Sequence, residues 1–162
     1  MRLLCSQILG FVGPCSFQKV SFGQSCPTYI ISSPTARVVL RKRPGVKLPK
    51  SAHDIHREFR VLSALYPTGY PVPEPLLYYS DRELLGTDFY IMRFVDGRIF
   101  NNPAMPGVSP QERAKLYRSA LAELVRLHSY TPGDVGLQDL APSAGRGYYS
   151  RQISRLAKVS SR

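Results

Sequence analysis

A carboxylate inside an apolar helical stripe is the residue whose chemistry stands out in this sequence. Along residues 51–65, apolar side chains recur at steps of four, three and three, which predicts one buried face of a helix. These apolar residues are Ile55, Phe59, Leu62 and Leu65. Glu58 falls within the same stripe. Because an unpaired buried carboxylate is costly, we expect a cation to face Glu58.

The expected cation lies at the end of a short strand. Residues 38–40 form a β-branched and apolar run that predicts a strand, and Arg41 and Lys42 follow it directly. Side chains alternate between the two faces of a strand, so Arg41 and Lys42 point to opposite faces. We expect Arg41 to pair with Glu58, and Lys42 is the alternative if the register differs by one residue.

Positive charge is concentrated in two parts of the chain. The 162 residues carry 22 Lys and Arg against 11 acids, a net charge of +11. Residues 37–60 hold eight cations and two acids, and residues 146–162 hold five cations and no acid. Such clusters bind nucleic acid, anionic membranes or phosphorylated small molecules, and by default they form a solvated basic face. Charge is the only feature that supports nucleic acid, so we expect no nucleic-acid partner. No apolar run reaches the roughly 20 residues of a membrane span.

Cysteine and histidine spacing predicts no disulfide framework and no metal site. Cys5, Cys15 and Cys26 are odd in number and have no close pair. His53 and His56 are three residues apart on the predicted helix, but no third ligand is apparent nearby, and we interpret both as solvated side chains. The 43% hydrophobic content is sufficient for one domain with a core.

Turn residues divide the first hundred residues into about five strands and one helix. Two strands are expected within residues 15–31 around a Gly/Ser turn, a third at 37–41, another near Tyr78 and Tyr79, and the strongest at 87–95. Ser51 is the predicted N-cap of the helix, with Asp54 three residues on. The Gly/Ser turn could bring backbone N–H groups to a phosphate, although most such turns only reverse the chain.

A second helix is predicted after an Asn- and Pro-rich loop. Ser109 is its expected N-cap, with Pro110 at the first helical position and a stripe of apolar residues ending before His128. The stripe consists of Leu116, Ala120, Leu124 and Leu127. A third helix is expected over residues 148–159.

Six segments together resemble the aminoglycoside phosphotransferase and choline kinase-like family. They are SFGQSCPTYII, VLRKRPG, LPKSAHDIHREFRVLSAL, GYPVPEPLLYYSD, GTDFYIMRFVDGRIF and LHSYTPGDVGLQDL. The segments are most similar to the phosphotransferase domain of acyl-CoA dehydrogenase family members ten and eleven. The resemblance implies an α+β fold: a protein-kinase-like N-terminal lobe with a five-stranded antiparallel sheet and one helix, followed by the first helices of a C-terminal lobe. On this basis we divide the chain into an N-terminal extension (1–14), the N-lobe (15–97) and an incomplete start of the C-lobe (98–162).

The resemblance also implies a nucleotide site. Arg41 stands where most kinase folds place a phosphate-binding Lys, with Glu58 as its partner. Met92 takes the gatekeeper position, and the Arg93 carbonyl and the Val95 N–H would meet the adenine edge. The turn over the ATP phosphates consists of Gly23, Gln24, Ser25 and Cys26. Two departures from the family pattern are Arg93, where an acidic residue is usual, and Cys26, where Asn is common.

The catalytic part of the family pattern is absent from these residues. Phosphoryl transfer in this fold uses a catalytic Asp, an Asn and a metal-binding Asp from the second lobe. The sequence contains no His-Gly-Asp segment, and we interpret Asp134-Val135-Gly136 as an ordinary loop. We therefore expect no catalytic residue and no metal ligand, a chain truncated before the chemistry, and a marginally stable fold.

Several functional expectations follow from the resemblance. The family moves the ATP γ-phosphoryl group to a small-molecule hydroxyl, and a hydroxyacyl-CoA of fatty-acid metabolism is the implied substrate. ATP is the implied cofactor, Mg²⁺ would need the second lobe, and no FAD site is expected. Whether this chain acts as an enzyme is left open; the alternative is a non-catalytic nucleotide-binding or interaction module. The implied compartment is mitochondrial or peroxisomal, and otherwise cytoplasmic.

Overall fold

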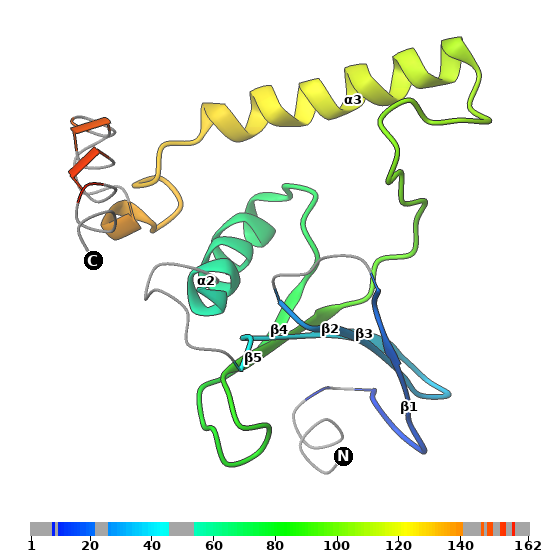
Figure 1. Ribbon diagram of the computed structural model, residues 1–162, viewed down its shortest axis with the longest axis vertical. Coiled ribbons are helices and arrows are strands. Elements are labelled where there is room, and N and C mark those ends of the chain that lie inside the picture. The colour runs from blue at the N-terminus through cyan, green and yellow to red at the C-terminus, as the bar shows by residue number, and fades with distance from the viewer. Residues whose placement is uncertain are drawn as a thin grey trace. The chain divides into compact units, whose positions relative to one another are not determined.

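The computed structural model describes residues 8, 10–21, 26–45, 54–140, 147, 149, 150, 153, 154 and 157 (Figure 1). The chain divides into two compact units, Met1–Arg118 and Ser119–Arg162. The first unit contains the whole sheet and the helix beside it, and it carries every candidate site residue.

Five antiparallel strands form one sheet in the order β1-β2-β3-β5-β4. They are β1 (Ser16–Lys19), β2 (Thr28–Ser32), β3 (Arg37–Lys42), β4 (Pro75–Tyr79) and β5 (Phe89–Arg93). The predicted five-stranded antiparallel sheet is confirmed. β5 is shorter than the predicted 87–95 stretch. It ends at Arg93 because its pairing with β3 ends there, and only the Phe94 N–H continues the ladder, donating to the Arg37 carbonyl at 3.3 Å.

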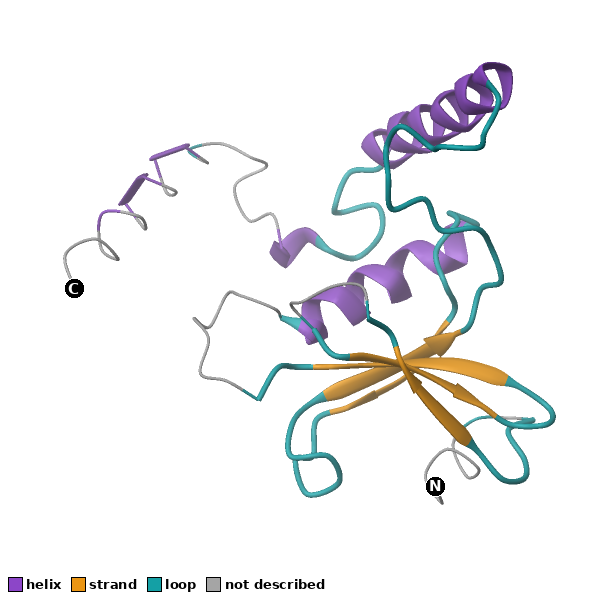
Figure 2. Cartoon of the chain, turned by 45° about the vertical axis from the view of Figure 1, so that its right-hand side comes forward, coloured by secondary structure: helices purple, strands orange, loops and turns teal. Residues whose placement is uncertain are grey.

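The helix α2 (Ile55–Leu65) crosses one face of the sheet (Figure 2). Its N-cap is Asp54, whose Oδ1 accepts a hydrogen bond from the Arg57 N–H at 3.0 Å. The predicted N-cap, Ser51, lies outside the described residues. A single 3₁₀ turn, Tyr66–Thr68, ends the helix, and Gly69 follows with φ of 72°.

Each face of the sheet has its own apolar cluster. On the α2 face, Cys26, Ile55 and Tyr90 are buried, and four partly buried side chains pack against them: Phe59, Leu62, Tyr78 and Met92. The opposite face contributes Ile31, Val38, Leu40, Phe89 and Ile91. Because side chains alternate along β5, Tyr90 and Met92 face α2 while Phe89 and Ile91 face away from it.

Two described residues of the N-terminal segment, Ile8 and Phe11, pack on the face of the sheet opposite α2. Ile8 is 5% exposed and Phe11 is 1% exposed, and both belong to the cluster on that face. Gly13 follows with φ of +93°, and a Cβ added there would lie 3.3 Å from the Pro34 side chain. Ile8 and Phe11, which we assigned to an N-terminal extension, thus contribute to the core of the first unit.

The long helix α3 (Pro110–Ser129) begins where the sequence predicted and ends one residue later. The Ser109 Oγ accepts a hydrogen bond from the Glu112 N–H at 3.2 Å, as expected of an N-cap. None of the α3 residues is buried, and Leu124 of the predicted apolar stripe is 45% exposed. A short 3₁₀ helix, Gln138–Leu140, follows. The described residues of the third predicted helix, 149, 150, 153, 154 and 157, are helical. Within the described part of the chain, no helix is both long and apolar enough to span a membrane.

Candidate functional site

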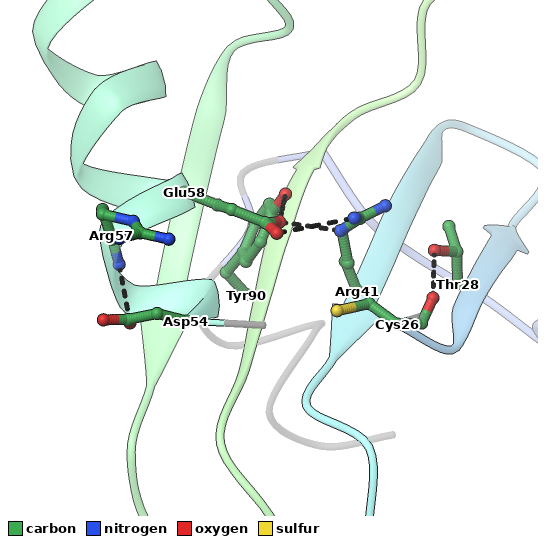
Figure 3. A network of polar contacts seen from close by, with 7 residues as sticks. All are labelled: Cys26, Thr28, Arg41, Asp54, Arg57, Glu58 and Tyr90. Carbon is green, nitrogen blue, oxygen red and sulfur yellow. Dashed lines mark hydrogen bonds and ion pairs between the residues drawn. The ribbon is translucent and has the colours of Figure 1, made fainter. Parts of the chain in front are cut away.

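The predicted ion pair between Arg41 and Glu58 is present and joins β3 to α2 (Figure 3). Arg41 Nε donates to Glu58 Oε2 at 2.8 Å, and Nη2 approaches Oε1 at 3.5 Å. Burial alone would lower the pKa of Arg41, but the hydrogen bond and charge of Glu58 outweigh burial and raise it. The guanidinium is therefore held as a cation, and it binds the carboxylate through Nε and Nη2.

Tyr90 is a third member of this network that the sequence did not predict. Its hydroxyl donates to Glu58 Oε2 at 3.3 Å, and Tyr90 is the direct cross-strand partner of Arg41. Burial, followed by the charge of Glu58, raises the pKa of the Tyr90 phenol, which therefore stays neutral. Arg41 and Tyr90 together fix the position of the Glu58 carboxylate.

The pair remains accessible to a ligand. The Arg41 side chain is 33% exposed and that of Glu58 is 34% exposed. Glu58 and Tyr90 also line a cavity of about 350 Å³, together with Arg57, Val61 and Leu62. The half-buried Arg41 cation is held by Glu58, which lines this cavity, and an accessible cation of this kind suits an anionic ligand.

Lys42, the alternative partner of Glu58, lies on the opposite face of β3. Its Nζ donates to the Leu85 carbonyl at 3.3 Å. Strand alternation therefore selects Arg41 for the α2 face and directs Lys42 toward the β4–β5 loop.

Cys26, two residues before β2 begins, packs beside this network. It is 4% exposed, and its carbonyl accepts a hydrogen bond from the Thr28 hydroxyl at 3.0 Å. Burial raises the pKa of the Cys26 thiol, the charge of Arg41 opposes the increase, and the charge of Glu58 adds to it. The thiol is thus a packed, protonated group at neutral pH. Cys15 is also a free thiol, and Cys5 lies outside the described residues.

We predict that Cys26 reacts slowly with iodoacetamide in the folded chain. The thiolate is the nucleophile, and a raised pKa lowers its fraction at neutral pH. Cys26 alkylation at pH 7, followed by mass spectrometry, should be at least about tenfold slower in the native chain than in denaturant, and it should accelerate as pH rises through the folded pKa. Equal native and denatured rates at pH 7 would contradict this prediction.

The residues proposed for the adenine edge lie at and just after the end of β5. Met92 points to the α2 face, and the Arg93 N–H donates to the Glu74 carbonyl at 2.9 Å. Val95 is 64% exposed, and within the described part of the chain its N–H makes no backbone hydrogen bond. Val95 therefore has an amide that a planar ligand edge could use.

Some predicted site residues cannot be located. Gly23, Gln24 and Ser25 lie outside the described residues, as does His53. His56 is exposed, in agreement with its interpretation as a solvated side chain, and its ring centroid lies 4.8 Å from that of Tyr78. No group of three metal-ligating side chains occurs among the described residues. Asp134 accepts a hydrogen bond from the Thr131 N–H at 3.0 Å within a local turn, in agreement with the loop interpretation.

This sheet order, with a helix between the third and fourth strands and a strand cation paired to a helix Glu, defines the N-terminal lobe of a kinase-like phosphotransferase. Residues 16–161 match the family model described as the phosphotransferase enzyme family. The chain belongs to this family.

The chain is similar in sequence to one part of several larger proteins. Acyl-CoA dehydrogenase family member 11 of Gallus gallus is 43% identical over 157 residues, which are 94% of this chain and 20% of that protein. Family member 10 of Mus musculus is 41% identical over 146 residues, 90% of this chain and 14% of that protein. The chain thus spans about a fifth or less of the length of these relatives.

A solved structure shares the fold. A protein of Ralstonia eutropha described as an aminoglycoside phosphotransferase aligns with a TM-score of 0.75 and 33% identity, covering 97% of this chain and 44% of that one. The similarity extends over both compact units and confirms the predicted kinase-like architecture.

Proposed function

We propose that this chain carries the ATP-binding part of a small-molecule phosphotransferase. The Arg41–Glu58 ion pair is the observation that carries the proposal, because it presents an oriented cation whose side chain is 33% exposed. Arg41 would contact the ATP phosphates through the part of its guanidinium that does not bind Glu58. The turn at 23–25 would cover the phosphates. Met92 and the backbone of Arg93 and Val95 would frame the adenine.

The residues present fit ATP better than they fit a metal ion. Arg41 supplies a fixed positive charge for phosphate, whereas the described residues contain no group of three metal-ligating side chains. ATP would supply the transferable phosphoryl group, and this chain's own residues would bind and orient it. Transfer needs an acidic residue to accept the substrate proton, and the sequence contains no His-Gly-Asp segment that would supply it.

The substrate we propose for the complete phosphotransferase is a small molecule with a free hydroxyl, of the hydroxyacyl-CoA type. Support comes from the similarity to acyl-CoA dehydrogenase family members 10 and 11, which covers most of this chain. No described residue is assigned to the substrate, because the proposed roles of this lobe concern ATP.

We predict that the purified 162-residue chain binds ATP saturably but transfers no phosphate. Calorimetric titration with ATP should give a one-site isotherm. ADP should compete with ATP for this site, because the proposed contacts include the adenine and the phosphates. Incubation with [γ-³²P]ATP and a 3-hydroxyacyl-CoA should give no labelled product above a protein-free control. Absence of saturable binding at millimolar ATP would refute the proposed site, and labelled product would refute the proposed lack of transfer.

A further inference from the structure

Arg37, the first residue of β3, holds the segment that leaves β5 through three contacts. Its Nη2 donates to Asp96 Oδ2 at 3.1 Å. Its guanidinium carbon lies 4.1 Å from the centroid of the Phe94 ring. Its backbone carbonyl accepts a hydrogen bond from the Phe94 N–H at 3.3 Å. Arg37 thus fixes the two residues that flank Val95 in the sequence.

Arg93, the residue before Phe94, is held from the other side of β5, next to the lead-in to β4. The Arg93 N–H donates to the Glu74 carbonyl at 2.9 Å, and the two side chains form an ion pair. The backbone from Arg93 to Asp96 is therefore tied to the lead-in to β4 at one end and to β3 at the other. Regular strand pairing has already ended along most of this segment.

These contacts act locally rather than on global stability. The Arg37 side chain is 48% exposed and that of Asp96 is 83% exposed, and exposed ion pairs contribute little to folding. A cation over an exposed ring adds a similarly small amount. Together they restrict the backbone of a short segment that has few other interactions, which is where small energies change conformational populations.

We infer that Arg37 is a positioning residue for the nucleotide base. This inference rests on the proposed function, which assigns the adenine edge to the Arg93 carbonyl and the Val95 N–H. By fixing Phe94 and Asp96, Arg37 keeps the Val95 N–H in a binding-competent orientation. A segment that adopts this orientation only part of the time binds more weakly by the same fraction. Arg37 contributes no contact to the phosphates.

Three probes separate base positioning from phosphate binding: ATP, adenosine and inorganic tripolyphosphate. In the full 162-residue chain, Arg37→Ala should weaken ATP and adenosine binding by about fivefold each, because the competent fraction falls. Tripolyphosphate affinity should stay within about twofold of wild type, apart from the small change that one exposed charge brings. A merely structural role would weaken the binding of all three probes together.

A matched control has the same chemistry at another place. Arg98 pairs with Glu112 at 2.9 Å and lies 5.2 Å from the Phe100 ring centroid. Arg98→Ala removes the same charge and the same kind of ring contact, and it should leave adenosine affinity unchanged. Asp96→Ala, at a largely exposed side chain, should reproduce part of the Arg37→Ala effect without endangering the fold, and Arg37→Lys should retain part of the affinity.

The outcomes distinguish this inference from the proposed function. If the wild-type chain binds ATP but Arg37→Ala and Asp96→Ala leave adenosine affinity unchanged, the role of Arg37 is overturned. The proposed ATP site is then unaffected. A parallel loss of tripolyphosphate affinity would also overturn it. Failure of the wild-type chain to bind any of the three probes would overturn both.

Discussion

Arg41→Ala is expected to weaken ATP binding by at least about 30-fold, which corresponds to the ~2 kcal/mol of a charge-assisted hydrogen bond. The substitution removes the cation that Glu58 orients. It also leaves the Glu58 carboxylate, which is only one-third exposed, facing the phosphates without its counterion. Both effects act against a polyanionic ligand, so this substitution should have the largest effect on binding of any single change in the site.

The Glu58 variant tests whether the carboxylate acts through Arg41. Glu58→Ala alone should weaken ATP binding by only about fivefold, because the cation remains but loses its orientation. In the Arg41→Ala background the same change should improve binding, because it removes a negative charge beside the phosphates. The double variant is therefore expected to bind ATP more tightly than Arg41→Ala alone, and the opposite sign of the two Glu58→Ala effects is the diagnostic result.

Control variants of the Arg41 series separate the loss of Arg41 from a change in net charge and from unfolding. Arg41→Lys retains the cation with a different geometry and should keep most of the affinity. Arg98→Ala removes one positive charge away from the pair and should bind ATP as the wild type does. Near-UV circular dichroism of each variant should match that of the wild type. Equal ATP affinities for Arg41→Ala and Arg98→Ala would show that the pair does not contact the nucleotide.

The central ion pair could be predicted from the sequence because both partners are marked by local patterns. Glu58 is identified by the helical spacing of its apolar neighbours, and Arg41 by its place at the end of an apolar run. The structure confirms the stripe, since Ile55 and Leu65 are buried on the face that α2 turns to the sheet. Alternation along β3 left two cations to choose between, and the observed register assigns Arg41 to that face.

Tyr90 and Arg37 could not be assigned their roles from the sequence, because both depend on strand pairing between distant segments. Tyr90 meets Glu58 since it lies directly across from Arg41 in the β3–β5 ladder. Arg37 meets Asp96 across 59 residues of sequence. The register between strands that are far apart in the sequence is set by tertiary packing, and local periodicity does not indicate it. The strength of the 87–95 run predicted a strand, but not which of its residues would face the helix.

The core role of Ile8 and Phe11 could not be predicted for a different reason. Ile8 and Phe11 lie in a mildly apolar stretch without helical or strand periodicity, so pattern reading gives them no core role. A usable signal was present in the flanking glycines: Gly10 and Gly13 adopt φ of 81° and 93°, conformations that let the chain turn and lie against the sheet. The family resemblance began only at residue 15 and therefore says nothing about these residues.

Phe11→Ala is expected to destabilise the first unit by about 3–5 kcal/mol, the usual loss for a large buried ring. Phe11 is 1% exposed in the cluster opposite α2, where it packs with residues of three strands. Given a total stability of roughly 5–15 kcal/mol for an ordinary domain, this substitution should remove much of the fold. Denaturant titration followed by far-UV circular dichroism measures the change in the free energy of unfolding.

The adjacent residue is the matched control, and it makes the prediction specific to the buried face. Val12 is 62% exposed, so Val12→Ala should change the free energy of unfolding by no more than about 0.5 kcal/mol. If Phe11 and Val12 variants unfolded at the same denaturant concentration, the segment would be a loose extension after all. A large difference between the two would make residues 8–14 part of the lobe whose opposite face holds Arg41 and Tyr90. The proposed nucleotide site would then depend on this N-terminal segment, because both faces pack on the same strands.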